Sequence, residues 1–123
     1  HGFVSYRPAL VNSCNIFFYN VGAKLGIEPL GEIGNAVGLG QRSGIELEGE
    51  NPGIMPTPEW KQRVLGQPWW KGETISVAIG QGMLQITPLQ GANLMAAVAT
   101  GVRYRPRLSG KSIGVHLLND GGI

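Results

Sequence analysis

The chain has 123 residues, which suffice for one domain with a modest hydrophobic core and are too few for two. Only 15% of the residues are charged, the net charge is +2, and no basic run is present to follow a phosphate backbone, so nucleic acid is excluded as a partner. The most apolar stretch, residues 91–102, contains Asn93 and Thr100 and is shorter than the roughly 18 residues of a membrane span, so no membrane anchor is predicted.

The low charge and the 20 glycines favour a segment whose apolar faces pack against other parts of a longer protein. Isolated from those parts, such a segment is expected to self-associate through its apolar faces. The alternative is a loop-rich domain that folds alone. The single cysteine, Cys14, excludes an internal disulfide and leaves the redox compartment open.

Two helices are predicted at the start of the chain. Ser5 precedes a short apolar stretch over residues 7–11 and is positioned to cap it. Residues 12–15 break the pattern, and residues 16–25 then show helical spacing that ends at Gly26.

A third helix is predicted to open at Glu28 and Pro29 and to close at residues 38–40, because apolar residues recur at helical spacing between them. Residues 44–48 instead alternate between apolar and acidic side chains, and turn residues follow them at 49–53. This alternation predicts a short strand.

The middle of the chain contains one well-marked helix and one ambiguous segment. Thr57 is placed to cap a helix over residues 58–65, which ends before a glycine. Residues 68–72 are predicted to form a loop. Residues 74–82 are apolar and β-branched, and their pattern fits either a strand or a buried extended segment.

The clearest helix signal comes last. Thr87 and Gln90 fit a capping box, in which each side chain accepts a hydrogen bond from the backbone amide of the other residue. A helix is therefore predicted over residues 88–100. Residues 102–108 are expected to be extended, and residues 115–118 to be able to pair with another strand. The predicted fold class is mainly α with one or two short strands.

Ser13 and Asn15 are the candidate catalytic residues. In an extended step, side chains two apart share a face, so both would enter one cleft while Cys14 packs inward. A serine hydroxyl donates and accepts a proton, and an asparagine amide offers donors and an acceptor, which suits acyl transfer. The alternative is that residues 12–15 only cap and link two helices.

The order of motifs along the chain resembles the transpeptidase domain of class B penicillin-binding proteins, specifically the penicillin-binding protein 2 family. Ser13-Cys14-Asn15 matches the Ser-x-Asn motif, one of three site motifs in serine penicillin-binding enzymes. The resemblance covers residues 1–108, with residues 109–123 as a divergent or frayed tail. It rests on residues 1–2, 7–10, 13–19, 38–40, 43–47, 56–61, 68–69, 72–74, 79–82, 87–90 and 104–106.

The resemblance implies a helical lobe of an α+β fold and a D,D-transpeptidase that cross-links peptidoglycan during cell elongation. Its partners would be stem peptides ending in D-Ala-D-Ala, β-lactams, the remainder of the parent chain and a membrane glycosyltransferase. The parent would lie at the extracytoplasmic face of the bacterial inner membrane. By resemblance, Ser13 relays a proton to the leaving amine, and Asn15 orients the substrate and the lysine beside the nucleophile.

Two parts of that machinery are missing from the sequence. None of the six serines has a lysine three positions on, and no lysine precedes Thr-Gly or Ser-Gly. Without a nucleophile the chain alone is predicted to be inactive. The alternative function is a non-catalytic helical module that binds a partner protein or a cell-wall peptide.

Other candidate residues favour structural roles. Residues 79–82 are interpreted as architecture, the three tryptophans as packing, and the alternating glutamates as a solvated strand face. His1, His116 and Cys14 are too scattered for a zinc site, so neither a metal nor a cofactor is predicted.

Overall fold

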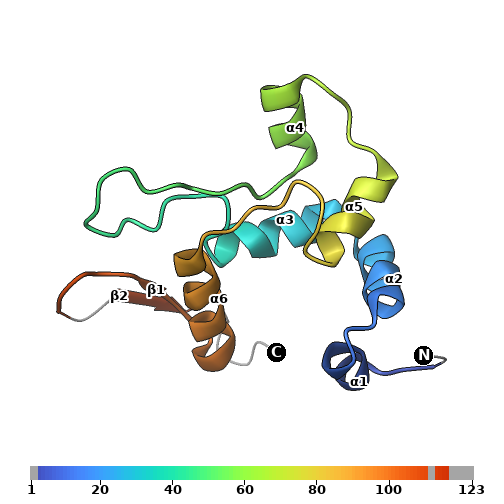
Figure 1. Cartoon of the computed structure of the whole chain (residues 1–123), viewed down its shortest axis with the longest axis horizontal. Helices are drawn as coiled ribbons and strands as arrows, with labels where there is room; N and C mark the ends of the chain where they lie inside the picture. The colour runs from blue at the N-terminus through green and yellow to red at the C-terminus, as the bar shows by residue number, and fades with distance from the viewer. Residues whose placement is uncertain (1–2, 111–112, 117–123) are drawn as a thin grey trace. The chain divides into compact units, whose positions relative to one another are not determined.

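The computed structural model describes residues 3–110 and 113–116, and in them it is mainly helical with two short strands (Figure 1). The predicted fold class is thereby confirmed. The elements in chain order are α1 (Tyr6–Val11), α2 (Asn15–Leu25), α3 (Ile27–Ala36), α4 (Pro58–Leu65), α5 (Lys71–Ala78), α6 (Pro88–Thr100), β1 (Val102–Arg105) and β2 (Ile113–His116).

The chain divides into two compact units. The first consists of residues 1–31 and 56–84 and contains α1, α2, α4 and α5. The second consists of residues 32–55 and 85–123 and contains α6 and the two strands. The helix α3 contributes residues to both units.

The predicted helix ends are confirmed where capping chemistry marked them. Thr57 Oγ1 accepts a hydrogen bond from the Trp60 amide at 3.1 Å at the start of α4. At α6 the capping box is complete, because Thr87 Oγ1 accepts from the Gln90 amide at 3.1 Å and Gln90 Oε1 accepts from the Thr87 amide at 3.0 Å. Ser5 is the N-cap residue of α1, but its side chain makes no capping hydrogen bond.

The strand predicted over residues 44–48 is wrong, because this segment forms no ladder. Side chains instead bind the backbone at Gly44 and at Ser43, the residue just before the segment. Both carboxylate oxygens of Glu50 accept the Ser43 amide at 3.0 Å, and Arg105 Nη2 donates to the Gly44 carbonyl at 3.2 Å. Alternating side chains define two faces, but a strand also needs a neighbouring backbone, and here the polar groups find side-chain partners.

The extended segment predicted over residues 74–82 is also wrong, because most of it lies in α5. The predicted loop over residues 68–72 ends early for the same reason. The Glu73 carboxylate accepts the amide of the N-cap residue Trp70 at 2.6 Å, so an acidic residue at the third helical position supplies the start signal. Burial of Thr74 and Val77 then outweighs their low helix propensity.

Glu73 also joins α5 to α4. Its Oε1 lies 2.6 Å from Lys61 Nζ, and the Lys61 side chain is only 5% exposed. Burial alone would raise the pKa of Glu73, but the hydrogen bonds from Lys61 and the Trp70 amide and the charge of Lys61 outweigh it, so the pKa is lowered. The ion pair therefore fixes the α4–α5 connection with its charges in place.

In the second unit, polar side chains hold the long connection between α3 and α4. Gln90 is buried, and its Nε2 donates to the carbonyls of Gln41 at 3.0 Å and Pro52 at 2.7 Å. Arg103 Nη1 donates to the Ala36 carbonyl at 3.3 Å, at the end of α3 where a cation complements the helix dipole. These contacts position a segment that has no ladder of its own.

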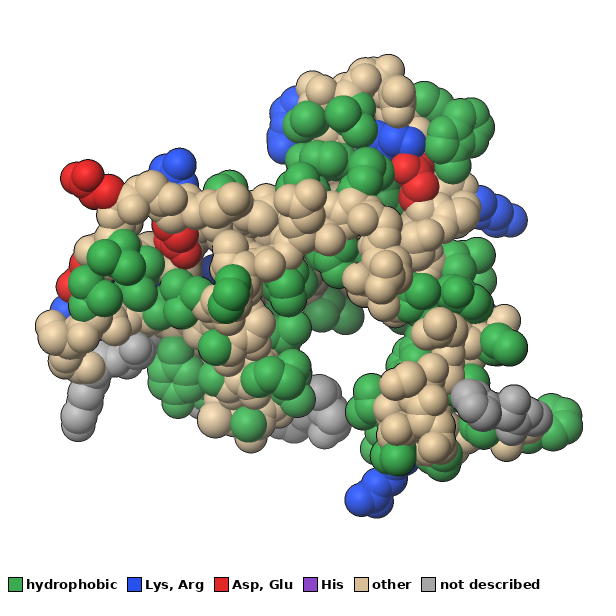
Figure 2. Space-filling model, viewed as in Figure 1, with side chains coloured by type: hydrophobic (Ala, Val, Ile, Leu, Met, Phe, Trp, Pro, Cys, Tyr) green, Lys and Arg blue, Asp and Glu red, His purple; other side chains and the backbone are tan. Residues whose placement is uncertain are grey.

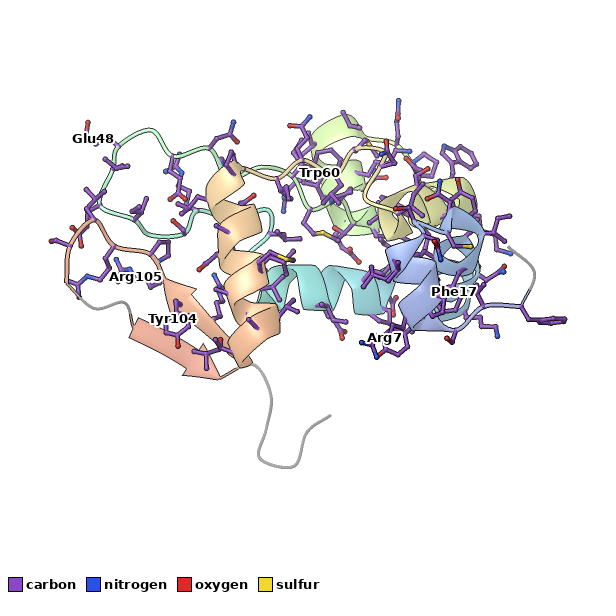
Figure 3. The ribbon with its side chains drawn as sticks, turned by 60° about the horizontal axis from the view of Figure 1, so that its bottom comes forward. Arg7, Phe17, Glu48, Trp60, Tyr104 and Arg105 are labelled. Atoms are coloured by element: carbon purple, nitrogen blue, oxygen red, sulfur yellow. The ribbon has the colours of Figure 1, made fainter. Side chains whose placement is uncertain are left out.

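The strands β1 and β2 pair antiparallel, with Val102 opposite His116 and Arg105 opposite Ile113. Tyr104 and Arg105 are labelled on β1 in Figure 3. The predicted extension after α6 is confirmed over Val102–Arg105, and pairing in the predicted 115–118 segment is confirmed for residues 115 and 116. Residues 117–118 lie outside the described residues.

Large apolar side chains remain on the surface of both units, as the green areas of Figure 2 show. In the first unit the most exposed of them on helices are Val11, Tyr6, Leu10 and Ile16. In the part of the chain that the structure describes, no helix has both the length and the hydropathy to cross a membrane. The self-association predicted from exposed apolar faces of the isolated chain stays a prediction.

Replacing Glu73 by glutamine keeps the shape of the side chain but leaves the buried Lys61 ammonium without a counter-charge. At pH 7 we expect the free energy of unfolding to fall by about 2–3 kcal/mol. Because the folded-state pKa of Glu73 is depressed, the carboxylate stabilises the fold fully above its unfolded-state pKa, and this stabilisation is lost as pH falls through the folded-state pKa.

Urea unfolding followed by circular dichroism at several pH values measures the effect. The difference between Glu73→Gln and the parent sequence should be largest at neutral pH and should shrink below about pH 4.5, the ordinary pKa of the carboxyl group. Glu32→Gln, at an exposed position of α3, is the matched control and should have little effect. A pH-independent difference would contradict the charged ion pair.

Candidate functional site

The turn between α1 and α2 places the candidate catalytic residues. The C-cap residue Asn12 donates both its amide and its Nδ2 to the Pro8 carbonyl, each at 2.9 Å. The Cys14 amide donates to the Ala9 carbonyl at 2.8 Å, and Cys14 is the N-cap residue of α2. The turn therefore closes tightly on the end of α1, and Asn15 is already the first residue of α2, not the last residue of the break.

Ser13 has a left-handed backbone, with φ of 50°, and it is the non-glycine residue with positive φ among those described. The extended step expected through Ser13 is therefore wrong. The physical reason is that α1 ends in a tight turn, in which the Ser13 amide donates to the Leu10 carbonyl at 3.3 Å and the Cys14 amide to the Ala9 carbonyl, and a left-handed residue closes such a turn. A left-handed serine is strained by roughly 1 kcal/mol relative to a glycine, so the surrounding hydrogen bonds must hold it.

The side chains of residues 13–15 nevertheless alternate between exposed and buried, as their spacing predicts. Cys14 is 3% exposed and buried with Ala9, whereas Ser13 and Asn15 are exposed. The left-handed residue turns Ser13 outward, and the helix start turns Asn15 outward. The two polar side chains therefore flank a buried apolar anchor.

Ser13 and Asn15 line the same cavity of about 300 Å³ in the first unit. The apolar part of its wall comes from Leu10 of α1, Phe18 of α2, and Ala78 and Ile79 at the end of α5. Phe18 is itself held by an edge-to-face contact with Phe17, labelled on α2 in Figure 3, at 5.1 Å between ring centroids.

The sequence pattern does not predict the apolar residues that line this cavity. Residues 74–82 were interpreted as extended, so the end of α5 was not expected beside the Ser13–Asn15 turn. The spacing from Trp70 to Glu73 is a local signal for the start of α5, but it does not place the end of that helix beside the turn.

The residues that line the cavity offer two kinds of chemistry, polar and apolar. A hydroxyl that both donates and accepts sits beside an amide that does the same, which suits proton relay and the orientation of a substrate amide. Apolar side chains line the rest of this cavity and offer contact surface to an apolar part of a ligand. None of the residues that line this cavity is a nucleophile with an adjacent base.

The other candidate residues are placed as follows. Glu50 accepts hydrogen bonds from Ser43, which lowers its pKa, and Glu46 lies 3.4 Å from Arg107, so these glutamates are engaged with neighbours and not on a bare strand face. Trp69 Nε1 donates to Thr74 Oγ1 at 2.9 Å, which favours packing for that tryptophan. Among the described residues no cluster of three metal-ligating side chains occurs; His1 lies outside them.

Comparison with known proteins decides the family. The family model described as the penicillin-binding protein transpeptidase domain matches residues 1–117. The chain belongs to the penicillin-binding protein transpeptidase family. The resemblance noted from its motifs is confirmed, and the match extends past the predicted boundary at residue 108, which itself stays a prediction.

Curated relatives of this transpeptidase segment agree. It is 42% identical over 99 residues to the peptidoglycan D,D-transpeptidase MrdA of Acinetobacter baumannii, which is 80% of this chain and 15% of the relative. It is 40% identical over 109 residues to MrdA of Escherichia coli K12, which is 88% of this chain and 17% of the relative. The segment thus spans about a sixth of the length of these relatives.

Solved structures of penicillin-binding protein 2 (PBP2) have the same fold as this transpeptidase segment. PBP2 of Pseudomonas aeruginosa in complex with WCK 5153 matches with a TM-score of 0.85 and 37% identity over 91% of this chain and 26% of that one. The complex of PBP2 and MreC from Helicobacter pylori matches with a TM-score of 0.89 and 33% identity over 98% of this chain and 23% of that one. The segment is therefore a helical portion of the transpeptidase fold.

The left-handed backbone of Ser13 predicts how substitutions there affect stability. Glycine adopts this conformation without strain, so Ser13→Gly should leave the free energy of unfolding unchanged or raise it by up to about 1 kcal/mol. Ser13→Val should lower it by about 1–2 kcal/mol, because a β-branched residue is poorly accommodated at positive φ. Urea unfolding measures both, and a stabilising valine would contradict the left-handed assignment.

Proposed function

We propose that this chain is the central portion of the transpeptidase domain of a peptidoglycan D,D-transpeptidase of the penicillin-binding protein 2 type. The observation that carries the proposal is that Ser13 and Asn15, the residues of the Ser-x-Asn motif, line one cavity together with apolar side chains. The identity of about 40% with curated MrdA proteins over most of the chain supports the same conclusion.

In this proposal a serine supplied by polypeptide outside this chain attacks the carbonyl carbon of the penultimate D-Ala of a stem peptide. The serine loses its proton, the peptide bond breaks, and the terminal D-Ala leaves as an amine that gains a proton. The Ser13 hydroxyl passes the proton toward that amine, and the Asn15 amide holds the substrate and the lysine next to the nucleophile. The acyl-enzyme then transfers to an amine of a second stem peptide. A β-lactam enters the same first step and remains attached.

The proposed partners follow from the relatives. The H. pylori protein was solved with MreC, and a further match, with a TM-score of 0.78, bears the description "structural coordination of polymerization and crosslinking by a peptidoglycan synthase complex". We infer that the whole enzyme works beside a membrane glycosyltransferase during cell elongation, at the extracytoplasmic face of the inner membrane. The exposed apolar side chains of the first unit are then covered by the rest of the parent chain.

Fluorescent penicillin tests the assignment of Ser13 in the full-length protein that carries this segment. Ser13→Ala should slow acylation by about 10²- to 10⁴-fold, the usual contribution of a positioned proton-transfer group. Ser5→Ala is the matched control, because the Ser5 side chain makes no capping hydrogen bond and lies outside the cavity; it should acylate normally. Normal acylation by Ser13→Ala would contradict the proposed role.

The 123-residue chain alone should form no covalent adduct with the same reagent, since its sequence lacks a serine with a lysine three positions on. Mass spectrometry after incubation measures this directly. A stoichiometric adduct on the chain would show that it contains its own nucleophile, contrary to the proposal. An unreactive full-length protein would instead favour the non-catalytic binding module.

A further inference from the structure

The helices α2 and α5 make the most extensive helix–helix contact of the described residues, and one glycine permits it. A Cβ atom added to Gly22 would overlap the Cβ atom of Ala78, well inside van der Waals distance. Gly22 is buried in the middle of α2 and has no positive φ. Backbone freedom therefore does not require glycine here, whereas the close approach of α5 does.

The contact lies next to the candidate site. Ala78, which meets Gly22, lines the Ser13–Asn15 cavity together with Ile79. Hydrogen bonds fix this end of α5, because the amides of Ile79 and Gln81 both donate to the Ser76 carbonyl, at 3.3 and 2.8 Å. A shift of α5 would therefore carry Ala78 and Ile79 with it, whereas the other apolar lining residues belong to α1 and α2.

We propose that Gly22 is a positioning residue for the acylation reaction, because it sets the distance from Ser13 and Asn15 to the two lining residues at the end of α5. Ser13 and Asn15 are attached to the start of α2, and Ala78 and Ile79 belong to the end of α5. The α2–α5 spacing at Gly22 thus sets the distance between these two pairs of residues. A displacement of about 1 Å between groups that hold a substrate can slow a reaction about 10²-fold.

This inference rests on the proposed function, because its readout is acylation. The test uses the full-length protein that carries this segment, with Gly22→Ala, the double variant Gly22→Ala/Ala78→Gly, and Gly72→Ala. Gly72 is the matched control, since it lies in α5, outside the cavity, and a Cβ added there meets no atom within 4 Å. The rate constant of acylation by fluorescent penicillin and the labelled fraction at saturation are measured for each.

We expect Gly22→Ala to lower the acylation rate constant about tenfold or more while the labelled fraction stays near that of the parent. The double variant should be acylated faster than Gly22→Ala, because removing the Ala78 Cβ restores the space at the helix contact, and Gly72→Ala should match the parent. A merely structural role would reduce the labelled fraction and leave the rate of the folded molecules unchanged.

Three results overturn the inference while the proposed function survives: a normal rate in Gly22→Ala, a loss that appears only in the labelled fraction, or a double variant that folds but stays slow. If Gly22→Ala does not fold, the double variant decides, and recovery of folding and rate together supports the inference. If the parent protein itself is not acylated, the proposed function fails and the inference fails with it.

Discussion

The candidate site depends on the burial of Cys14 between two exposed polar residues. Cys14 is buried and its amide donates to the Ala9 carbonyl, which closes a tight turn at the end of α1, and Ser13 has the left-handed backbone that this turn requires. The strain is local, and apolar burial and hydrogen bonds offset it. A small apolar residue in the middle of the motif is therefore as important for the geometry as the two polar residues that line the cavity.

Buried polar contacts hold two parts of the chain in place: the short helices α4 and α5, and the long irregular connection after α3. The Lys61–Glu73 pair joins two helices of only eight residues each, which are too short to be stable without tertiary contacts. Gln90 joins the start of α6 to two carbonyls of the long connection after α3. Lys61 and Gln90 are almost fully buried, so losing their hydrogen-bond partners would cost free energy of folding.

The sequence was sufficient to predict elements whose ends carry their own chemistry. Thr57 with Pro58, and Thr87 with Gln90, satisfy backbone amides locally, so α4 and α6 could be placed from residues near each end. The α5 helix was missed because its β-branched residues favour extended structure and only tertiary burial reverses that preference. Ser13 and Asn15 were found by motif, whereas Ala78 and Ile79 join them only through packing that no local pattern encodes.

The arginines of β1 and of the residues after it have a consequence for solubility. Arg105 and Arg107 are two apart and contact Gly44 and Glu46, which are also two apart, so cationic side chains lie along a segment whose alternation resembles that of a sheet edge. Backbone groups without a partner in a sheet can pair with another chain. Because the Arg105 guanidinium occupies the Gly44 carbonyl and Arg107 places a positive charge beside Glu46, this segment offers fewer free backbone groups to a second chain.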